Sequence, residues 1–170
     1  MSRSLLADAF EHHVWATLRL IDACADLTAE QLATAVPGTY GSILDTLRHT
    51  VGADCSYLAL LSNGAREEVE EASLDLPALR AAMAENEPIW AALLADEPDP
   101  AVEVVRRRDD GSESGAPMGV RLAQAVHHGT DHRSQVCTAL TELGIEPPEI
   151  DVWAWAWDHD RLRETEPTDG

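Results

Sequence analysis

Apolar side chains recur at intervals of three and four residues through most of the chain, a period that is typical of amphipathic helices. The pattern predicts four long helices, which run from Ser4 to about Asp26, from about Ile43 to Ser62, from near Asp75 to the residues before Pro98, and from about Pro117 to Leu143. Helices of this length, each with one apolar face, predict an all-α fold in which they pack as a four-helix bundle.

Residues at the helix ends support these boundaries. Ser42 is suited to cap the second helix, and the carboxylate of Asp45 favours its positive end. Asn63-Gly64 is expected to end that helix, and Gly144 the fourth, because asparagine and glycine suit the left-handed backbone that follows a helix. Pro88 lies inside the third helix and is expected to kink it.

Two segments between the helices differ in character. Val102, Val104 and Val105 favour β-structure, and Asp110-Gly111 is a hairpin turn signal. We therefore expect a short strand or hairpin as an insertion before the fourth helix. Residues 65–73 are rich in glutamate and predict a solvated linker between the second and third helices.

A tryptophan-rich segment follows the fourth helix. Trp153, Trp155 and Trp157 alternate with other residues at period two, which favours a strand, although an irregular segment laid over the end of the bundle is the alternative. Three neighbouring indoles are expected to cover the core, a dimer partner or the mouth of a site. We assign residues 1–160 to one bundle domain and residues 161–170 to a polar C-terminal tail.

The composition excludes several classes of partner. The 170 residues include 12 basic and 31 acidic side chains, for a net charge of −19. A surface this acidic disfavours binding to nucleic acid or to an anionic membrane. The sequence has no apolar stretch long enough to span a membrane and no signal or transit pattern at its start. Three widely spaced cysteines, Cys24, Cys55 and Cys137, predict reduced thiols and a cytoplasmic protein.

The histidines carry the strongest chemical signal. His128 and His132 are spaced i, i+4, so they project from one face of the fourth helix and can reach one metal ion. His49 lies in the second helix, and facing helices of a bundle can bring it to the same ion. Three imidazole ligands leave open coordination positions, as catalytic metal sites do. The alternative is that each histidine is partly exposed or hydrogen-bonded without a metal.

Other polar residues are candidates for supporting roles. His12 and His13 point about 100° apart on the first helix, so one of them could serve the site as acid, base or substrate contact. Arg133 is expected either to pair with an acid on another helix or to bind an anionic group. Three more residues could hold an imidazole N–H, or could be surface or capping residues instead; they are Asp45, Gln124 and Gln135.

The run His128-Gly-Thr-Asp-His132-Arg-Ser-Gln135 is similar to the fourth-helix signature of the DinB/YfiT-like metalloenzyme family. The segment from Gly41 to His49 resembles the second helix of that family, and the segment from Leu143 to Asp151 resembles its ending. The resemblance covers most of residues 5–157. It implies a four-helix bundle that binds a divalent metal through His49, His128 and His132.

The same resemblance implies a function. Characterised members include transferases and isomerases that use mycothiol or bacillithiol, among them a mycothiol-dependent maleylpyruvate isomerase. We therefore expect a metal-dependent enzyme, with zinc or nickel as the favoured metal, that transfers a low-molecular-weight thiol to an electrophilic small molecule. The alternatives are a metal-dependent hydrolase and a non-catalytic stress protein that binds metal or a small ligand. The family also implies a homodimer.

Overall fold

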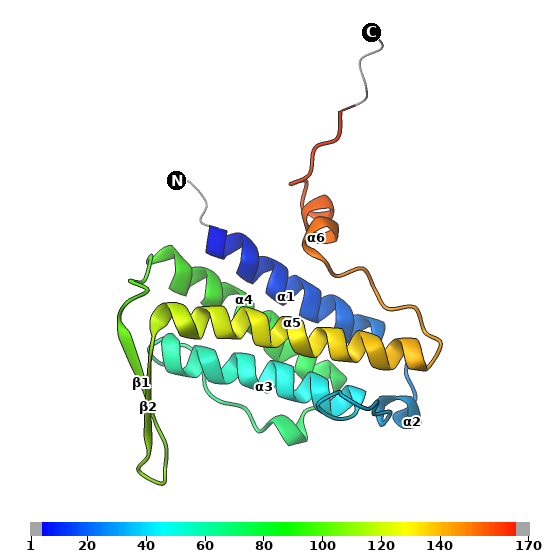
Figure 1. The fold of residues 1–170 in the computed structure, drawn as a ribbon, viewed down its shortest axis with the longest axis horizontal. Helices are drawn as coiled ribbons and strands as arrows, with labels where there is room; N and C mark the ends of the chain where they lie inside the picture. The colour runs from blue at the N-terminus through cyan, green and yellow to red at the C-terminus, as the bar shows by residue number, and fades with distance from the viewer. Residues whose placement is uncertain (1–4, 166–170) are drawn as a thin grey trace.

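The four predicted helices form a bundle in the computed structural model of the chain, which describes residues 5–165 (Figure 1). The helices are α1 (Leu5–Ala23), α3 (Ile43–Leu61), α4 (Leu76–Ala95) and α5 (Met118–Glu142). Both α1 and α3 pack against α4 and α5, so the bundle has α1 and α3 on opposite corners. Ser4, where the first helix was expected to begin, and residues 166–170 of the expected tail lie outside the described residues.

The local signals at the helix ends are confirmed. The Ser42 hydroxyl accepts a hydrogen bond from the Asp45 backbone N–H at 3.1 Å and so caps α3. Gly144, which follows α5, has a φ of +72°, a conformation that glycine adopts without strain. Pro88 lies inside α4, which continues on both sides of it.

A two-stranded antiparallel hairpin connects α4 to α5, as the β-prone segment predicted. It consists of β1 (Glu103–Arg107) and β2 (Glu113–Pro117), with Val105 opposite Gly115. The hairpin extends beyond one end of the bundle (Figure 1). The sequence also did not predict the short helix α2 (Ala29–Leu32) or the 3-10 helix η1 (Glu71–Ser73). The second of these gives part of the predicted linker a defined backbone.

The tryptophan-rich segment is a helix, so the expectation of a strand or an irregular segment was wrong. Helix α6 (Val152–Asp158) begins after Asp151, whose carboxylate accepts a hydrogen bond from the backbone N–H of Ala154. Only Trp155 is buried, at 3% exposure, whereas Trp153 and Trp157 are 70% and 59% exposed. Positions two apart on a helix lie on different faces, so Trp155 packs against His12 of α1 while Trp153 and Trp157 are largely exposed.

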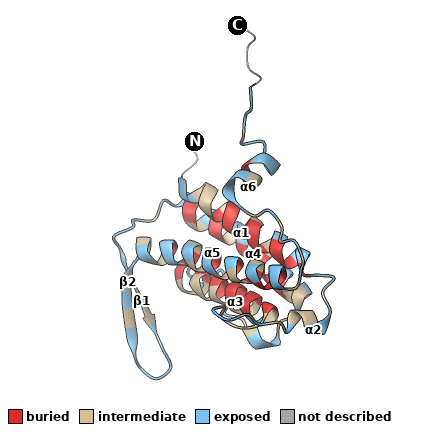
Figure 2. Ribbon diagram, turned by 45° about the vertical axis from the view of Figure 1, so that its right-hand side comes forward, coloured by how far each residue is buried: buried red, intermediate tan, exposed pale blue. Residues whose placement is uncertain are grey.

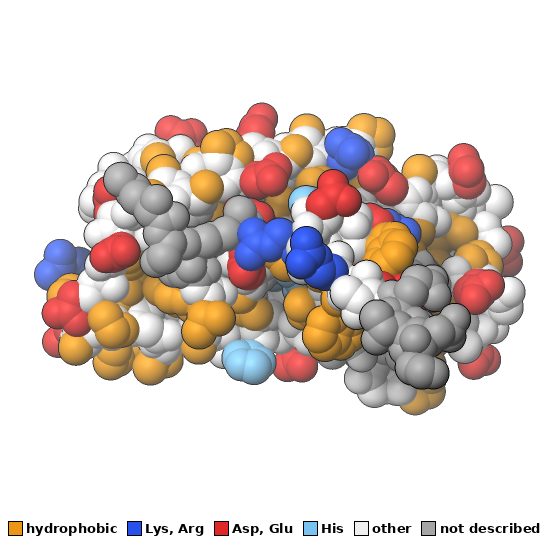
Figure 3. Space-filling model, turned by 90° about the horizontal axis from the view of Figure 1, so that it is seen from above, with side chains coloured by type: hydrophobic (Ala, Val, Ile, Leu, Met, Phe, Trp, Pro, Cys, Tyr) orange, Lys and Arg blue, Asp and Glu red, His pale blue; other side chains and the backbone are white. Residues whose placement is uncertain are grey.

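The buried residues lie along the facing stripes of the four long helices (Figure 2). The rings of Phe10 and Trp90 pack with centroids 4.4 Å apart, where α1 meets α4. Acidic side chains are scattered over the face shown in Figure 3 rather than gathered in one patch. No helix within residues 5–165 has the length and apolar character needed to cross a bilayer.

Candidate metal centre

Three histidines from two helices meet at the contact between α3 and α5. His49 comes from α3, and His128 and His132 come from successive turns of α5. One ligand nitrogen from each ring lies within 4.8 Å of the others, and the Nε2 atoms of His49 and His128 are 3.1 Å apart. The i, i+4 pair and the histidine of the facing helix therefore form the group that the sequence predicted.

The donor set fits a divalent ion. Two nitrogen ligands at about 2.0–2.1 Å from a four- or six-coordinate ion are roughly 2.9–3.4 Å apart, and the separation of the Nε2 atoms of His49 and His128 falls in this range. Imidazole ligands suit zinc, nickel, copper and iron alike. Among the described residues, no fourth His, Cys, Asp or Glu belongs to the group. Three protein ligands would leave coordination positions open.

The outer nitrogens of two of these rings have acidic or polar partners. The Gln135 Oε1 atom lies 3.3 Å from Nδ1 of His132, as the sequence suggested for Gln135. A Glu71 carboxylate oxygen lies 3.8 Å from Nδ1 of His49, within ion-pair range but too far for a hydrogen bond. Tyr40 stacks on the His49 ring with centroids 4.1 Å apart. With their Nδ1 atoms beside these partners, the rings of His49 and His132 have their Nε2 atoms available to a metal ion.

Glu71 is expected to support metal binding through His49. Replacement by glutamine removes the charge and should weaken metal affinity by about tenfold, the lower end of the effect of such outer partners. Gly52→Ala should act in the same direction, because its Cβ would lie 2.4 Å from Glu71 Oε2 and displace it. Metal titration of the folded variants measures both effects. Glu70→Gln, which changes an exposed neighbour in the same segment, is the control and should bind like the wild type.

Burial disfavours the charged form of His128 and of His132 in the metal-free protein, so the pKa of each is lowered. Desolvation, followed by the neighbouring His132 and His49, lowers the pKa of His128 from 6.5 to about 4. The folded state then binds fewer protons than the unfolded chain between these values, so stability falls as the pH falls through this window. We expect the wild type to lose more stability than His128→Gln between pH 6.5 and about 4. Thermal unfolding after chelation measures this, and equal losses would contradict it.

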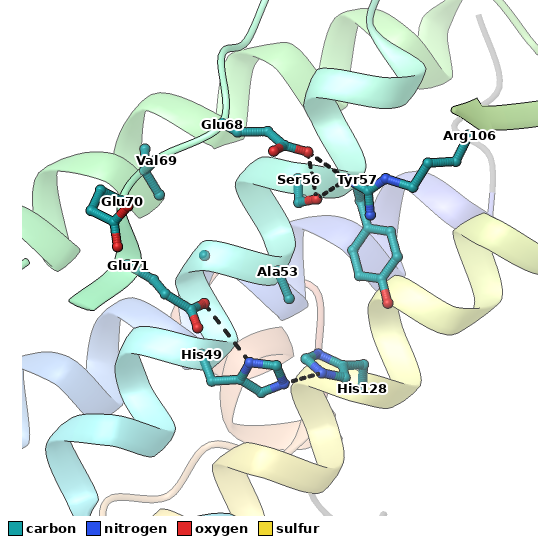
Figure 4. A pocket seen from close by; sticks show the side chains of 11 residues that line it. His49, Ala53, Ser56, Tyr57, Glu68, Val69, Glu70, Glu71, Arg106 and His128 are labelled. Carbon is teal, nitrogen blue, oxygen red and sulfur yellow. Dashed lines mark hydrogen bonds and ion pairs between the residues drawn. The ribbon is translucent and has the colours of Figure 1, made fainter. Parts of the chain in front are cut away.

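A pocket of about 380 Å³ adjoins the histidines (Figure 4). His49 and His128 lie at one end, and Arg106 of β1 reaches in at the other, where it contacts Glu68 and Ser56. The pocket lies between α3 and the acidic segment that precedes α4. Sequence reasoning treated that segment as a solvated linker. It missed that this segment lines the pocket, because glutamates in a linker carry no pattern that distinguishes the two roles.

Some predicted residues lie away from the group. Asp45 is exposed and contacts Ser42 and Arg48 near the start of α3, where it lines a second pocket beside Glu71. Gln124 is exposed on α5. His12 is buried, and its Nε2 atom lies 2.8 Å from the Ile150 carbonyl oxygen. The structure therefore places His12 where it ties α1 to the segment before α6, and not in either pocket.

His13 and Arg133 meet in the core of the bundle. His13 is 1% exposed, and its Nδ1 atom lies 3.0 Å from a guanidinium nitrogen of Arg133. Its Nε2 atom lies 2.9 Å from a carboxylate oxygen of Asp54, which is 2% exposed. His13 therefore links Arg133 of α5 to the Asp54 carboxylate of α3. The pKa of Arg133 is lowered to about 10, mainly by burial, so it stays charged at neutral pH.

Asp54 and its other partners were missed in the sequence. Its second carboxylate oxygen accepts hydrogen bonds from the Asn86 amide at 2.8 Å and the Trp90 indole at 3.0 Å, both on α4. We call Asp54, His13 and Arg133, together with Asn86 and Trp90, the core network. It has members on all four long helices. An aspartate on an apolar helix face was the one available signal, and its partners are distant in sequence.

The fold and the site define a class, that of helical-bundle proteins with three histidines that could hold a metal ion beside an open pocket. The family model of the DinB family matches residues 1–166, and the chain belongs to this family. A comparison with curated proteins finds no significant match.

Proposed function

We propose that the protein is a divalent-metal-dependent enzyme that transfers a low-molecular-weight thiol, mycothiol-like, to an electrophilic small molecule. The observation that carries the proposal is the three-histidine group, of which His49 and His128 line one end of the pocket. Membership in the DinB family supports a metal role and the thiol chemistry that the resemblance implies. A fourth protein ligand that closed the site, with no cavity beside it, would instead have favoured a purely structural metal site.

Each part of the site has a task in this reaction. A divalent ion on His49, His128 and His132 would lower the pKa of a thiol that reaches an open position. Gln135 is a hydrogen-bond partner of the outer nitrogen of His132, and the Glu71 carboxylate lies 3.8 Å from the outer nitrogen of His49. The rest of the pocket receives the remainder of the substrate, with hydroxyl groups of Ser56 and Tyr57 along its wall. Zinc and nickel are the metals we favour.

Two features of the proposal concern the setting of the enzyme. We place it in the cytoplasm, because Cys24, Cys55 and Cys137 are free thiols, as a reducing compartment requires. Burial raises the pKa of Cys24 to about 12, so this thiol is unreactive and fills space in the core. We also propose a homodimer, for which the exposed Trp153 and Trp157 of α6 are the first residues to test.

The activity test compares metal-loaded and chelated protein with mycothiol, bacillithiol and glutathione against a panel of electrophiles. The proposal predicts thiol consumption that requires the metal and is lost in His49→Ala. His127→Ala, an exposed histidine outside the group, serves as the matched control and should keep full activity. Metal-dependent cleavage of esters or amides without thiol use would instead favour a hydrolase. Metal binding with no turnover of either kind would leave a non-catalytic binding protein.

A further inference from the structure

We propose that the core network is a positioning device, in which the contacts of His13 with Asp54 and Arg133 set α5 against α3 so that the three metal ligands converge. The inference rests on the proposed function, because it concerns the same metal group. None of the five network residues has a ligand atom in that group. Their effect would pass through the helices on which the ligands lie.

The polarity of the contacts allows one consistent arrangement. A guanidinium can only donate, so Nδ1 of His13 accepts from Arg133. An ionised carboxylate can only accept, so Nε2 of His13 carries the proton and donates to Asp54. His13 is therefore a neutral bridge between a buried anion and a buried cation. Rotating or sliding α1, α3 or α5 would break at least one of these bonds and leave a charge without its partner.

Helix α5 links this network rigidly to the metal group. His128 and His132 form one i, i+4 row, and Gly129 and Arg133 form the next row on the same helix. The second row faces α1, where the His13 ring lies so close to Gly129 that an added Cβ would be 2.3 Å from its Cε1 atom. Both rows belong to one rigid backbone, so any rotation of α5 that moves Arg133 also moves the two ligands.

Apolar packing alone would leave this rotation less well determined. Buried polar groups with fixed partners can specify register where apolar side chains tolerate small slips. Arg133 donates further hydrogen bonds to Thr17 of α1 at 3.1 Å and to Thr130 of α5 at 3.1 Å. The guanidinium is thus held on both helices. The network therefore couples the face of α5 that contacts α1 to the face that contacts α3.

The test compares metal affinity in folded variants. His13→Ala removes the bridge, and His13→Gln keeps an N–H donor for Asp54 but lacks the ring that fits against Gly129. Leu79→Ala is the matched control, because Leu79 is fully buried on α4 and outside the network. Each protein is titrated with Zn²⁺ against a competing chelator at a temperature where it is folded, and the Co²⁺ absorption spectrum reports the coordination geometry.

We expect His13→Ala to bind Zn²⁺ about 10–100-fold more weakly, with an altered Co²⁺ spectrum, and His13→Gln to fall between it and the wild type. Leu79→Ala should lower thermal stability and leave both readouts unchanged. If His13→Ala does not fold, His13→Gln decides the question. Wild-type affinity and spectrum in His13→Gln would overturn the inference alone. A wild-type protein that binds no metal would overturn the proposed function and the inference together.

Discussion

His132→Ala is expected to reduce bound metal from about one ion per chain to almost none after dialysis. Two imidazoles would remain, and the α5 half of the group would lose one of its two ligands. Loss of an outer partner alone costs about 10–100-fold in affinity, so loss of a direct ligand should cost more than about 100-fold. Elemental analysis gives the stoichiometry, and titration calorimetry gives the affinity of the folded variant.

His127→Ala provides the control for this experiment. His127 is also on α5 and is also a histidine, but it is exposed and outside the group. Both variants remove one imidazole from the same helix, so a general effect of fewer histidines or a changed helix propensity would appear in both. Unchanged metal content in His132→Ala would remove this residue from the ligand set.

Asp54→Ala is expected to be among the most destabilising single substitutions in the chain. It would leave the buried Arg133 cation without its counter-charge, and the His13, Asn86 and Trp90 donors without an acceptor. Breaking a buried charge pair from one side costs about 3–5 kcal/mol. For a chain of this length, this corresponds to a fall in Tm of roughly 10 °C. Thermal and urea unfolding of the metal-free protein measure the effect.

An exposed aspartate with an equally good partner serves as the comparison. Asp22 contacts Arg80 through two hydrogen bonds at 2.6 and 3.2 Å, and both side chains are about half exposed. Because water replaces such a surface pair, Asp22→Ala should cost only about 0–1 kcal/mol. Equal losses in Asp22→Ala and Asp54→Ala would show that the core network contributes no more than a surface ion pair.

Local signals in the sequence were enough to predict the helices and, together with the family resemblance, the three histidines that the structure brings together. The period of the apolar residues and the cap at Ser42 depend on neighbours a few positions away, so both can be read directly from the chain. The i, i+4 spacing of His128 and His132 is likewise local. The placement of His49 opposite them required the further step that α3 and α5 face each other in a bundle.

The remaining features depend on contacts between distant segments. His13 and Arg133 are separated by 120 positions, so no spacing rule connects them or brings Asp54 between them. Glu71 lies in a run of similar glutamates, and only the fold shows that it is the one beside His49. The helix containing Trp155 was misjudged because three identical residues at period two obscured the Asp151 cap.

The acidic character of the chain extends to the pocket beside the three histidines. Three glutamates line the pocket, and its arginine, Arg106, is already paired with one of them, Glu68. The surroundings of the histidines therefore share the acidic character of the whole chain, with its net charge of −19. Such a field favours the approach of a divalent cation and does not attract an anionic substrate over long range.

Anomalous diffraction from crystals of the metal-loaded protein tests the central claim most directly, because it locates the ion without reference to activity. Data collected on both sides of the absorption edge of the bound metal identify both its position and its element. Our account predicts one strong peak between the imidazoles of His49, His128 and His132, with an open side toward the pocket. A peak elsewhere on the chain, or an ion closed off by a fourth protein ligand, would contradict it.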